Sequence, residues 1–250
     1  MRYFLENCCT SAADAVIAQR SGASRIELCS RLDIGGITPS EDLLRETLLA
    51  LAEDSLSVQR VPDPLSPSPS SRVHSSSALS RLTLPPIPIN VLVRPRGGDF
   101  VYGEAEIQQT IAGIEMCKRL YVNNSAGYSL RVNGVVIGAL RDDGGIDMGA
   151  MRRLVAAARP LEVTFHRAFD ECADVESALE DVIALGCERL LTSGHEPDAF
   201  AGRFTLARLV RQAAGRIVIL AGCGIRPHNI DSIASISGAT EFHSSTLTGW

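Results

Sequence analysis

Eight short apolar segments recur along the chain, and each ends in charged residues, glycine, threonine or cysteine. Such a segment is typical of a buried parallel strand that delivers polar groups to the edge of a sheet. Helical patterns separate the segments, and this alternation predicts a parallel sheet with helices outside it. The predicted strands span residues 3–8, 25–29, 87–94, 134–140, 161–166, 188–192, 216–220 and 240–244.

Eight strand–helix units match an α/β fold of the (β/α)8 type, a TIM-type barrel with its active site at the carboxyl ends of the strands. An open doubly wound sheet is the alternative, although no G-x-G-x-x-G motif follows the first strand. Only six residues follow Ser244, so we expect the last outer helix to be missing or truncated. The 250 residues are 45% hydrophobic and 21% charged, which suits one barrel domain spanning 1–250.

Two stretches interrupt the regular spacing, and both lie between a helix and the next strand. Residues 53–86 are rich in serine and proline and cannot bury enough apolar surface to order themselves, so we expect a disordered insertion. Residues 121–132 are predicted to be a short loop insertion. Thr38 and Glu41 have the T-x-x-E spacing of a capping box, which predicts the start of a helix that ends near Ala52.

Composition limits the classes of partner. The net charge of −5 argues against nucleic acid, which needs a clustered basic surface. We find no apolar run of 18 residues and therefore predict no membrane span. Seven cysteines at irregular spacing indicate reduced thiols in a cytoplasmic protein. A second copy of the chain is a candidate partner.

Strand alternation places two carboxylates inside the predicted barrel. Glu6 lies two residues before Cys8, and Glu27 lies two residues before Cys29, so each pair shares one strand face. Because an unpaired buried charge is costly, we expect Arg94, Arg96 and His166 to pair with these carboxylates. A purely structural ion-pair network is one interpretation of this set.

The other interpretation is an enzyme that acts on a small anionic, perhaps phosphorylated, substrate. Arg94 would hold the anion, and His166 or Glu27 would transfer a proton. Asp170 follows the strand of His166 and would orient its ring. The candidate catalytic residues are Glu27, Arg94, His166 and Asp170, and the candidate substrate-binding residues are Glu6, Arg96, His243, Ser244, Gly222 and Gly224. Whether the chain is an enzyme at all is left open by the sequence.

Several motifs, taken together, resemble one family. They are R-I-E-L-C-S at 25–30, G-G-x-T-P-S at 35–40, R-P-R-G-G-D-F at 94–100, G-A-L at 138–140, T-F-H-R-A-F-D at 164–170, L-T-S-G at 191–194 and E-F-H-S at 241–244. They resemble the copper homeostasis protein CutC family over nearly the whole chain except the two insertions and the C-terminal end. The resemblance implies a TIM-type barrel, a cytoplasmic location and a role in copper handling.

The resemblance also implies Cu(I) binding by two cysteines that match Cys8 and Cys29 here. They end the first two predicted strands, which are neighbours in a barrel, and soft thiolates select Cu(I). Two buried thiols that act only as small apolar residues are the alternative. The expected function is therefore a cytoplasmic Cu(I)-binding protein, with the barrel enzyme as the second hypothesis.

Overall fold

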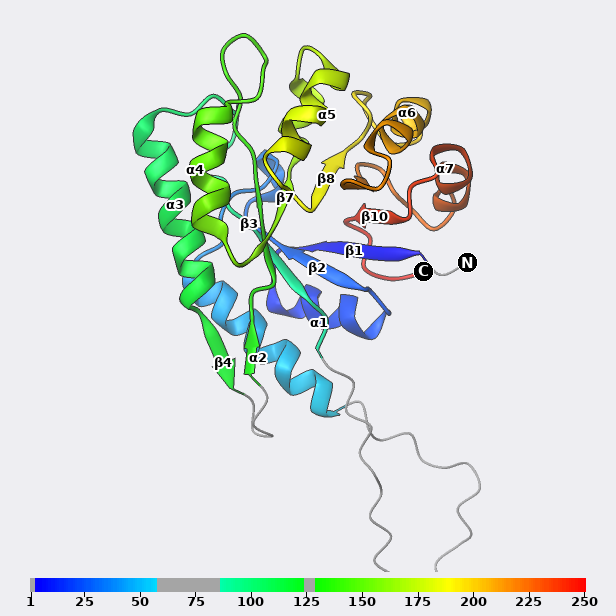
Figure 1. The fold of residues 1–250 in the computed structure, drawn as a ribbon. Coiled ribbons are helices and arrows are strands. Elements are labelled where there is room, and N and C mark those ends of the chain that lie inside the picture. The colour runs from blue at the N-terminus through cyan, green and yellow to red at the C-terminus, as the bar shows by residue number, and fades with distance from the viewer. Residues whose placement is uncertain (1–2, 58–85, 124–128) are drawn as a thin grey trace, which may run out of the picture.

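The computed structural model describes residues 3–57, 86–123 and 129–250. Eight parallel strands close into a barrel in the order β1-β10-β9-β8-β7-β6-β3-β2, which confirms the predicted α/β barrel (Figure 1). The barrel strands are β1 (Phe4–Cys9), β2 (Arg25–Leu28), β3 (Ile89–Leu92), β6 (Gly134–Ile137), β7 (Glu162–Phe165), β8 (Arg189–Thr192), β9 (Val218–Ala221) and β10 (Glu241–Ser244).

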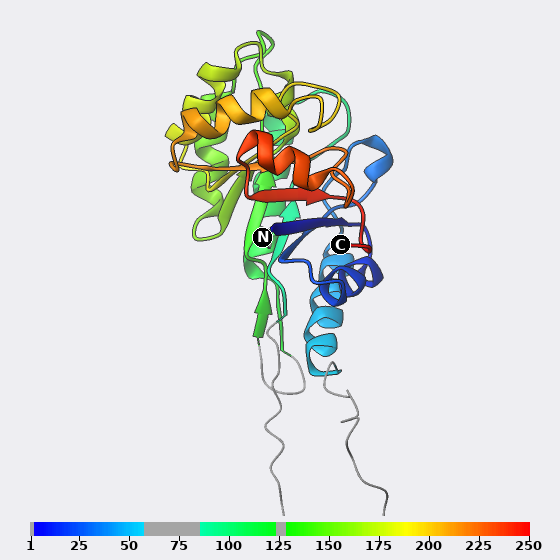
Figure 2. The same cartoon turned by 90° about the vertical axis from the view of Figure 1, so that its right-hand side faces the viewer.

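Seven α-helices within the described residues surround the barrel. They are α1 (Ala12–Arg20), α2 (Glu41–Ser57), α3 (Glu104–Arg119), α4 (Met148–Ala158), α5 (Val175–Ala184), α6 (Arg203–Ala213) and α7 (Ile230–Ser237). The first and last strands, blue and red in Figure 2, lie side by side and close the barrel, with Phe4 opposite Glu241. None of the helices in 3–57, 86–123 and 129–250 is long and apolar enough to cross a membrane.

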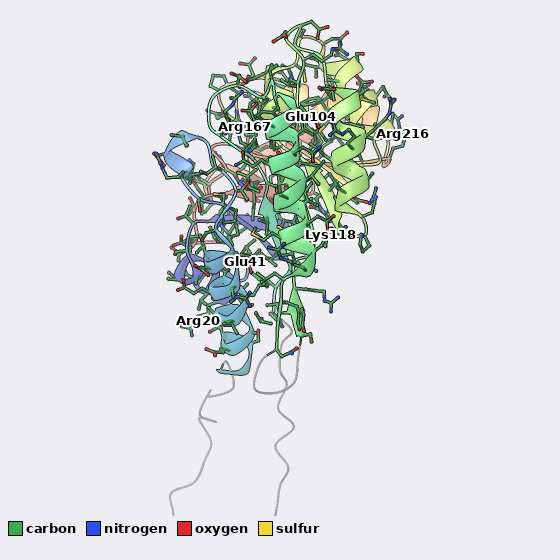
Figure 3. All side chains as sticks on the ribbon, turned by 90° about the vertical axis from the view of Figure 1, so that its left-hand side faces the viewer. Arg20, Glu41, Glu104, Lys118, Arg167 and Arg216 are labelled. Atoms are coloured by element: carbon green, nitrogen blue, oxygen red, sulfur yellow. The ribbon has the colours of Figure 1, made fainter. Side chains whose placement is uncertain are left out.

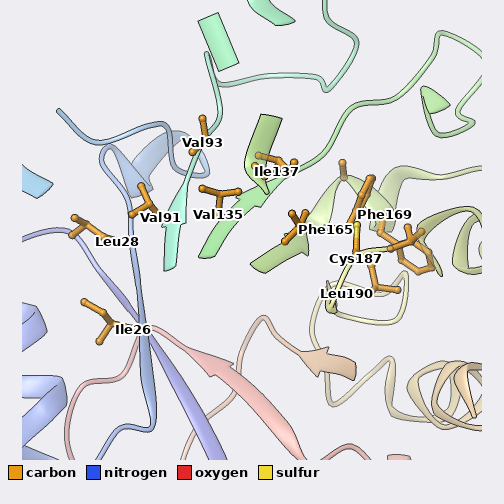
Figure 4. Packing of buried hydrophobic residues seen from close by; sticks show 14 of the residues in the cluster. Ile26, Leu28, Val91, Val93, Val135, Ile137, Phe165, Phe169, Cys187 and Leu190 are labelled. Carbon is orange, nitrogen blue, oxygen red and sulfur yellow. The ribbon is translucent and has the colours of Figure 1, made fainter. Parts of the chain in front are cut away.

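Alternate strand residues face either the helices or the barrel interior. Side chains such as Ile26, Val91 and Val135 belong to the large apolar core between strands and helices (Figure 4). Their neighbours in sequence form the interior: Cys8, Cys29, Leu92 and Val136 make a small separate buried cluster there. The period of two along each strand therefore fixes which residues reach the functional end of the barrel.

Charged side chains cover the outside of the helices (Figure 3). Arg153 of α4 donates to Glu104 of α3 at 2.6 Å, and Arg119 of α3 donates to Glu41 of α2 at 2.9 Å. Exposed pairs of this kind add little stability, so the helices are held mainly by the apolar core.

The predicted capping box at Thr38 is wrong. Helix α2 begins at Glu41, and Ser40 Oγ accepts a hydrogen bond from the Leu43 N–H at 3.2 Å. The Thr38 hydroxyl is engaged elsewhere: it donates to the Arg94 carbonyl and accepts from the Arg94 N–H, both at 2.9 Å. Thr38 thus ties the loop after β2 to the segment after β3.

The boundaries of the two insertions also differ from expectation. Helix α2 continues to Ser57 instead of ending near Ala52, because buried Asp54 accepts hydrogen bonds from Gln19 and Arg20 of α1. Residues 58–85 of the expected Ser/Pro-rich insertion lie outside the described residues. Part of 121–132 is not loop but an antiparallel ribbon of β4 (Tyr121–Asn123) and β5 (Ser129–Arg131). It forms because Val122 and Leu130 alternate with polar residues and pack into the core.

Candidate functional site

A cavity of about 820 Å³ lies at the carboxyl ends of the barrel strands. Residues from most of the strand ends and the loops after them contribute to its wall. Those on which the argument depends are Cys8, Glu27, Cys29, Arg94, Phe100, His166, Asp170, His195, Arg226 and His243. The structure therefore brings the two predicted cysteines and all four predicted catalytic residues to one cavity.

Cys8 and Cys29 form the thiol side of this cavity. β1 and β2 pair in parallel with Cys8 opposite Glu27, which brings the Cys8 and Cys29 sulfur atoms to 3.6 Å. Both side chains are buried, with exposed fractions of 7% and 1%. The hydrogen bond to Cys29 and burial both raise the pKa of the Cys8 thiol, so without a metal it holds its proton at neutral pH.

Two further donors lie beside the thiols. The Cys8 sulfur, a Glu27 carboxylate oxygen and a His243 ring nitrogen all lie within 4.8 Å of one another. Sulfur, imidazole and carboxylate are the ligand types of transition-metal sites. The four residues Cys8, Cys29, Glu27 and His243 are thus the donor set that this end of the barrel offers a metal ion.

Glu6 lies deeper in the barrel and is fully buried. Its carboxylate accepts from Arg25 Nε and lies 2.8 Å from His243 Nδ1, while Arg25 also donates to Glu241 at 2.9 Å. Burial raises the pKa of Glu6, but the hydrogen bond to His243 and the charge of Arg25 outweigh it and lower the pKa to about 2. The expected partners Arg94, Arg96 and His166 are wrong, because Arg25, on the inner face of β2, takes their place. Glu6 does not line the cavity and serves in this ion-pair network instead.

Glu27 is the second interior carboxyl group, and its Oε2 has no hydrogen-bond partner among the described residues. Burial raises its pKa to about 7, although the nearby charge of His243 opposes this shift. The folded protein therefore keeps this proton across most of the acidic pH range.

We expect Glu27→Gln to stabilise the protein at alkaline pH and to leave its stability unchanged in acid. A folded-state pKa of about 7, against an ordinary 4.5, gives stabilisation that is complete below pH 4.5 and is lost as the pH rises through 7. The amide removes this dependence, so at about pH 8 the variant should gain up to about 3 kcal/mol in the free energy of unfolding. Urea denaturation of both proteins across this range measures the difference. A difference that does not grow with pH would contradict the expectation.

Arg94 is buried, and its guanidinium is held by backbone carbonyl groups. Nη1 donates to the carbonyls of residues 34–36 at 3.2–3.4 Å, and Nη2 donates to Gly98 at 2.5 Å. The guanidinium carbon lies 4.5 Å from the centre of the Phe100 ring. Arg94 thereby holds together the loops that follow β2 and β3.

Arg96 does not line the cavity, contrary to the prediction that it contacts substrate. Its guanidinium donates to Glu106 at 2.5 Å and to Asp99 at 2.8 Å, and it lies over the Tyr102 ring. β3 ends at Leu92, so strand alternation no longer decides where the side chain at 96 points.

His166 directly follows β7 and is buried, but Asp170 does not orient it as predicted. The Ala168 N–H donates to His166 Nδ1 at 3.2 Å, and the Phe100 ring centre lies 4.9 Å from the imidazole. Asp170 accepts from Thr192, Ser193 and Arg167 instead, which joins the β7 and β8 loops. Burial and the charge of Arg94 lower the pKa of His166 to about 3, so the ring is neutral at pH 7.

The end of the barrel at β9 and β10 holds the remaining predicted residues. Ser244 lines the cavity, and its hydroxyl donates to the Ile225 carbonyl at 2.8 Å. Gly224 also lines the cavity, with a φ of +73° that favours glycine. Gly222 is not part of the cavity wall; a side chain there would collide with Leu191.

Several residues of the wall were missed from the sequence, among them Phe100, His195 and Arg226. They follow the strands in loops, where no alternation indicates direction. His195 and Cys223, in neighbouring loops, both have a positive φ, of +60° and +72° respectively. The Cys223 sulfur contacts the Pro197 carbonyl at 3.2 Å, which joins the two loops. Such strained backbone often occurs at functional sites, but it has no signal in the sequence.

Comparison with known proteins gives consistent matches over this fold. The sequence profile of the CutC family matches residues 3–60 and 65–248. A CutC family protein from Parabacteroides distasonis is 42% identical over 245 residues, which covers 98% of this chain and 83% of the relative. Another, from Xylella fastidiosa strain Temecula1, is 43% identical over 241 residues, covering 96% and 74%. The crystal structure of CutC from Streptococcus agalactiae, a protein suggested to act in copper homeostasis, matches with a TM-score of 0.78 and 25% identity, covering 99% of this chain and 100% of the other.

Proposed function

Because the chain belongs to the CutC family, we propose that it acts in copper homeostasis by binding Cu(I) through Cys8 and Cys29. The observation that carries the proposal is the 3.6 Å separation of two buried sulfur atoms on neighbouring strands. The suggested role of the Streptococcus agalactiae relative in copper homeostasis supports the same metal.

The donor chemistry fits a soft monovalent ion. Thiolates select Cu(I) over hard cations, and a low coordination number suits two ligands. Two metal–sulfur bonds of about 2.3 Å, the Zn–S length, can join atoms that are up to about 4.6 Å apart. At the observed separation of 3.6 Å, an ion with bonds of that length would lie about 1.4 Å from the line between the sulfur atoms. This bent arrangement needs no movement of the strands and leaves one side of the ion open to Glu27 or His243.

Binding at this site must release protons. The raised pKa of the Cys8 thiol means that the metal displaces a proton, so Cu(I) affinity should rise with pH. Glu27 and His243 lie beside the thiols and are placed to complete the coordination once they have lost their own protons. A cytoplasmic location, where thiols stay reduced, is part of the proposal.

We expect Cys8→Ser/Cys29→Ser to lower the affinity for Cu(I) by more than about 100-fold, because even the loss of outer partners of a metal site costs 10–100-fold. The measurement is an anaerobic Cu(I) titration against a chromophoric chelator. The matched control is Cys9→Ser/Cys117→Ser, which also removes two buried thiols but from the core outside the barrel. Wild-type affinity in the Cys8/Cys29 variant, or an equal loss in the control, would contradict the proposal.

A further inference from the structure

The cavity is much larger than one metal ion needs, and its wall on the side opposite the Cys8 strand has unsatisfied polar groups. β7, which His166 follows, lies four strands from β1 in the eight-strand ring and so opposite to it. The sulfur atoms therefore account for one side of an 820 Å³ space only. Ligand cavities for small organic molecules have this size.

His166 presents a hydrogen-bond donor that the protein does not use. Its Nδ1 accepts from the Ala168 N–H, so in the neutral ring the proton lies on Nε2. The side chain is only 5% exposed, and Nε2 has no partner in the part of the chain that the structure describes. A buried donor without a partner destabilises the protein, and a ligand with an acceptor oxygen would remove that cost.

Arg94 supplies a positive charge that no carboxylate among residues 3–57, 86–123 and 129–250 pairs with. Its side chain is 5% exposed, and its hydrogen bonds within the described residues go to neutral backbone carbonyls. Buried charges in proteins are normally paired with an opposite charge. A bound anion would provide that charge from the cavity.

The two groups lie on the same part of the wall. Phe100 contacts both, with its ring centre 4.5 Å from the Arg94 guanidinium carbon and 4.9 Å from the His166 ring centre. Arg94 and His166 follow β3 and β7, and the strand between them, β6, is followed by Gly138. A Cβ at residue 138 would come within 2.5 Å of His166 Cε1, so glycine at this position avoids a collision with the imidazole.

We propose that the cavity holds a second ligand site, formed by Arg94 and His166, for the carboxylate of a small organic acid. The site goes beyond copper binding and does not depend on it. One cation and one neutral N–H donor suit a singly charged oxygen acid. In the outer wall, Arg167 is already paired with Asp170. The remaining charged groups there are two carboxylates, Glu171 and Glu196, and one cation, Arg226. A doubly charged phosphate would therefore meet repulsion that a carboxylate largely avoids.

The test uses metal-free, full-length protein with ¹⁵N-labelled histidine and follows the ring signals of its five histidines by NMR. The titrations are run at about pH 8. Lactate is the probe, glycerol is its uncharged counterpart, and inorganic phosphate, most of which is doubly charged at that pH, is the comparison. Lactate should shift the His166 Nε2 signal saturably, whereas glycerol and phosphate should leave it unchanged. His166→Leu, which removes the N–H donor, should weaken lactate binding, measured by calorimetry, by about tenfold or more. The same change at exposed His228, outside the cavity wall, should not.

The proposal fails if lactate leaves the His166 signal unmoved in the wild-type protein. It fails equally if glycerol or phosphate produces the same shift, or if His166→Leu binds lactate with wild-type affinity. The wild-type spectrum decides the question even if a variant does not fold. Because no metal is added, failure here leaves the copper proposal untouched, and loss of Cu(I) binding in the cysteine variant leaves this one untouched.

Discussion

Arg25→Met is expected to lower the free energy of unfolding by about 3–5 kcal/mol at neutral pH, the usual cost of removing one partner from a buried ion pair. Arg25 is 2% exposed and joins two carboxylates, Glu6 and Glu241, inside the barrel. Methionine keeps much of the side-chain volume but removes the charge. Glu6 would then remain in the interior with His243 and a 3.4 Å hydrogen bond from Asn90 to offset its burial.

The pH dependence separates this charge effect from lost packing. Loss of the Arg25 charge removes one cause of the low pKa of Glu6, so this pKa rises relative to the wild type and the variant should regain part of its stability relative to the wild type as the pH falls. Chemical denaturation at several pH values measures both quantities. Arg216→Met, which removes an exposed pair with Glu180, is the control and should leave the denaturation midpoint unchanged. A wild-type midpoint for Arg25→Met would show that the buried network does not stabilise the barrel.

Gly202→Ala is expected to cost about 3 kcal/mol or more, at the upper end of the penalty for overpacking. A Cβ at residue 202 would overlap the Ser193 carbonyl oxygen and lie 3.1 Å from Gly194 Cα. These are backbone atoms, so no side-chain rotation relieves the collision. The loop between Ser193 and Gly202 contributes His195 to the cavity wall, and the variant should therefore disturb the cavity as well as the fold.

Gly149→Ala is the matched control for this substitution. Gly149 lies in the first turn of α4, and its nearest neighbour, Asp147 Oδ1, would be 3.4 Å from the new Cβ. Alanine there should be neutral or should stabilise by up to about 1 kcal/mol, because glycine is the weaker helix former. Thermal unfolding of both variants compares them directly. Equal midpoints would contradict the role given to the close contact of Gly202 with Ser193.

The barrel and the thiol pair could be predicted because both follow from strand alternation. Once 3–8 and 25–29 are neighbouring parallel strands, Cys8 and Cys29 must share the inner face near the same end. Arg25 lies two residues before Glu27 and shares its strand face by the same rule. It was not predicted as a partner of Glu6 because it lies at the start of its strand and not at the end. Its partner Glu241 comes from the far end of the chain, and only the closure of β1 against β10 brings them together.

The loop residues could not be placed in this way. Arg96 and Asp170 follow their strands, where the side-chain direction depends on turns and on which backbone groups need partners. Asp170 accepts hydrogen bonds from the hydroxyl of Thr192, at the end of the next strand, and from the backbone N–H and hydroxyl of Ser193 in the loop after it. Arg96 forms ion pairs with Glu106 and Asp99. Such choices depend on three-dimensional neighbours that a sequence pattern does not reveal.

X-ray absorption spectroscopy at the copper edge, on full-length protein loaded anaerobically with one equivalent of Cu(I), tests the copper proposal most directly. The Cys8–Cys29 site predicts sulfur atoms in the first coordination shell of the wild type and of the Cys9→Ser/Cys117→Ser control. It also predicts that this sulfur shell disappears in Cys8→Ser/Cys29→Ser. A first shell of nitrogen and oxygen only in the wild type, or a sulfur shell that persists without Cys8 and Cys29, would contradict it.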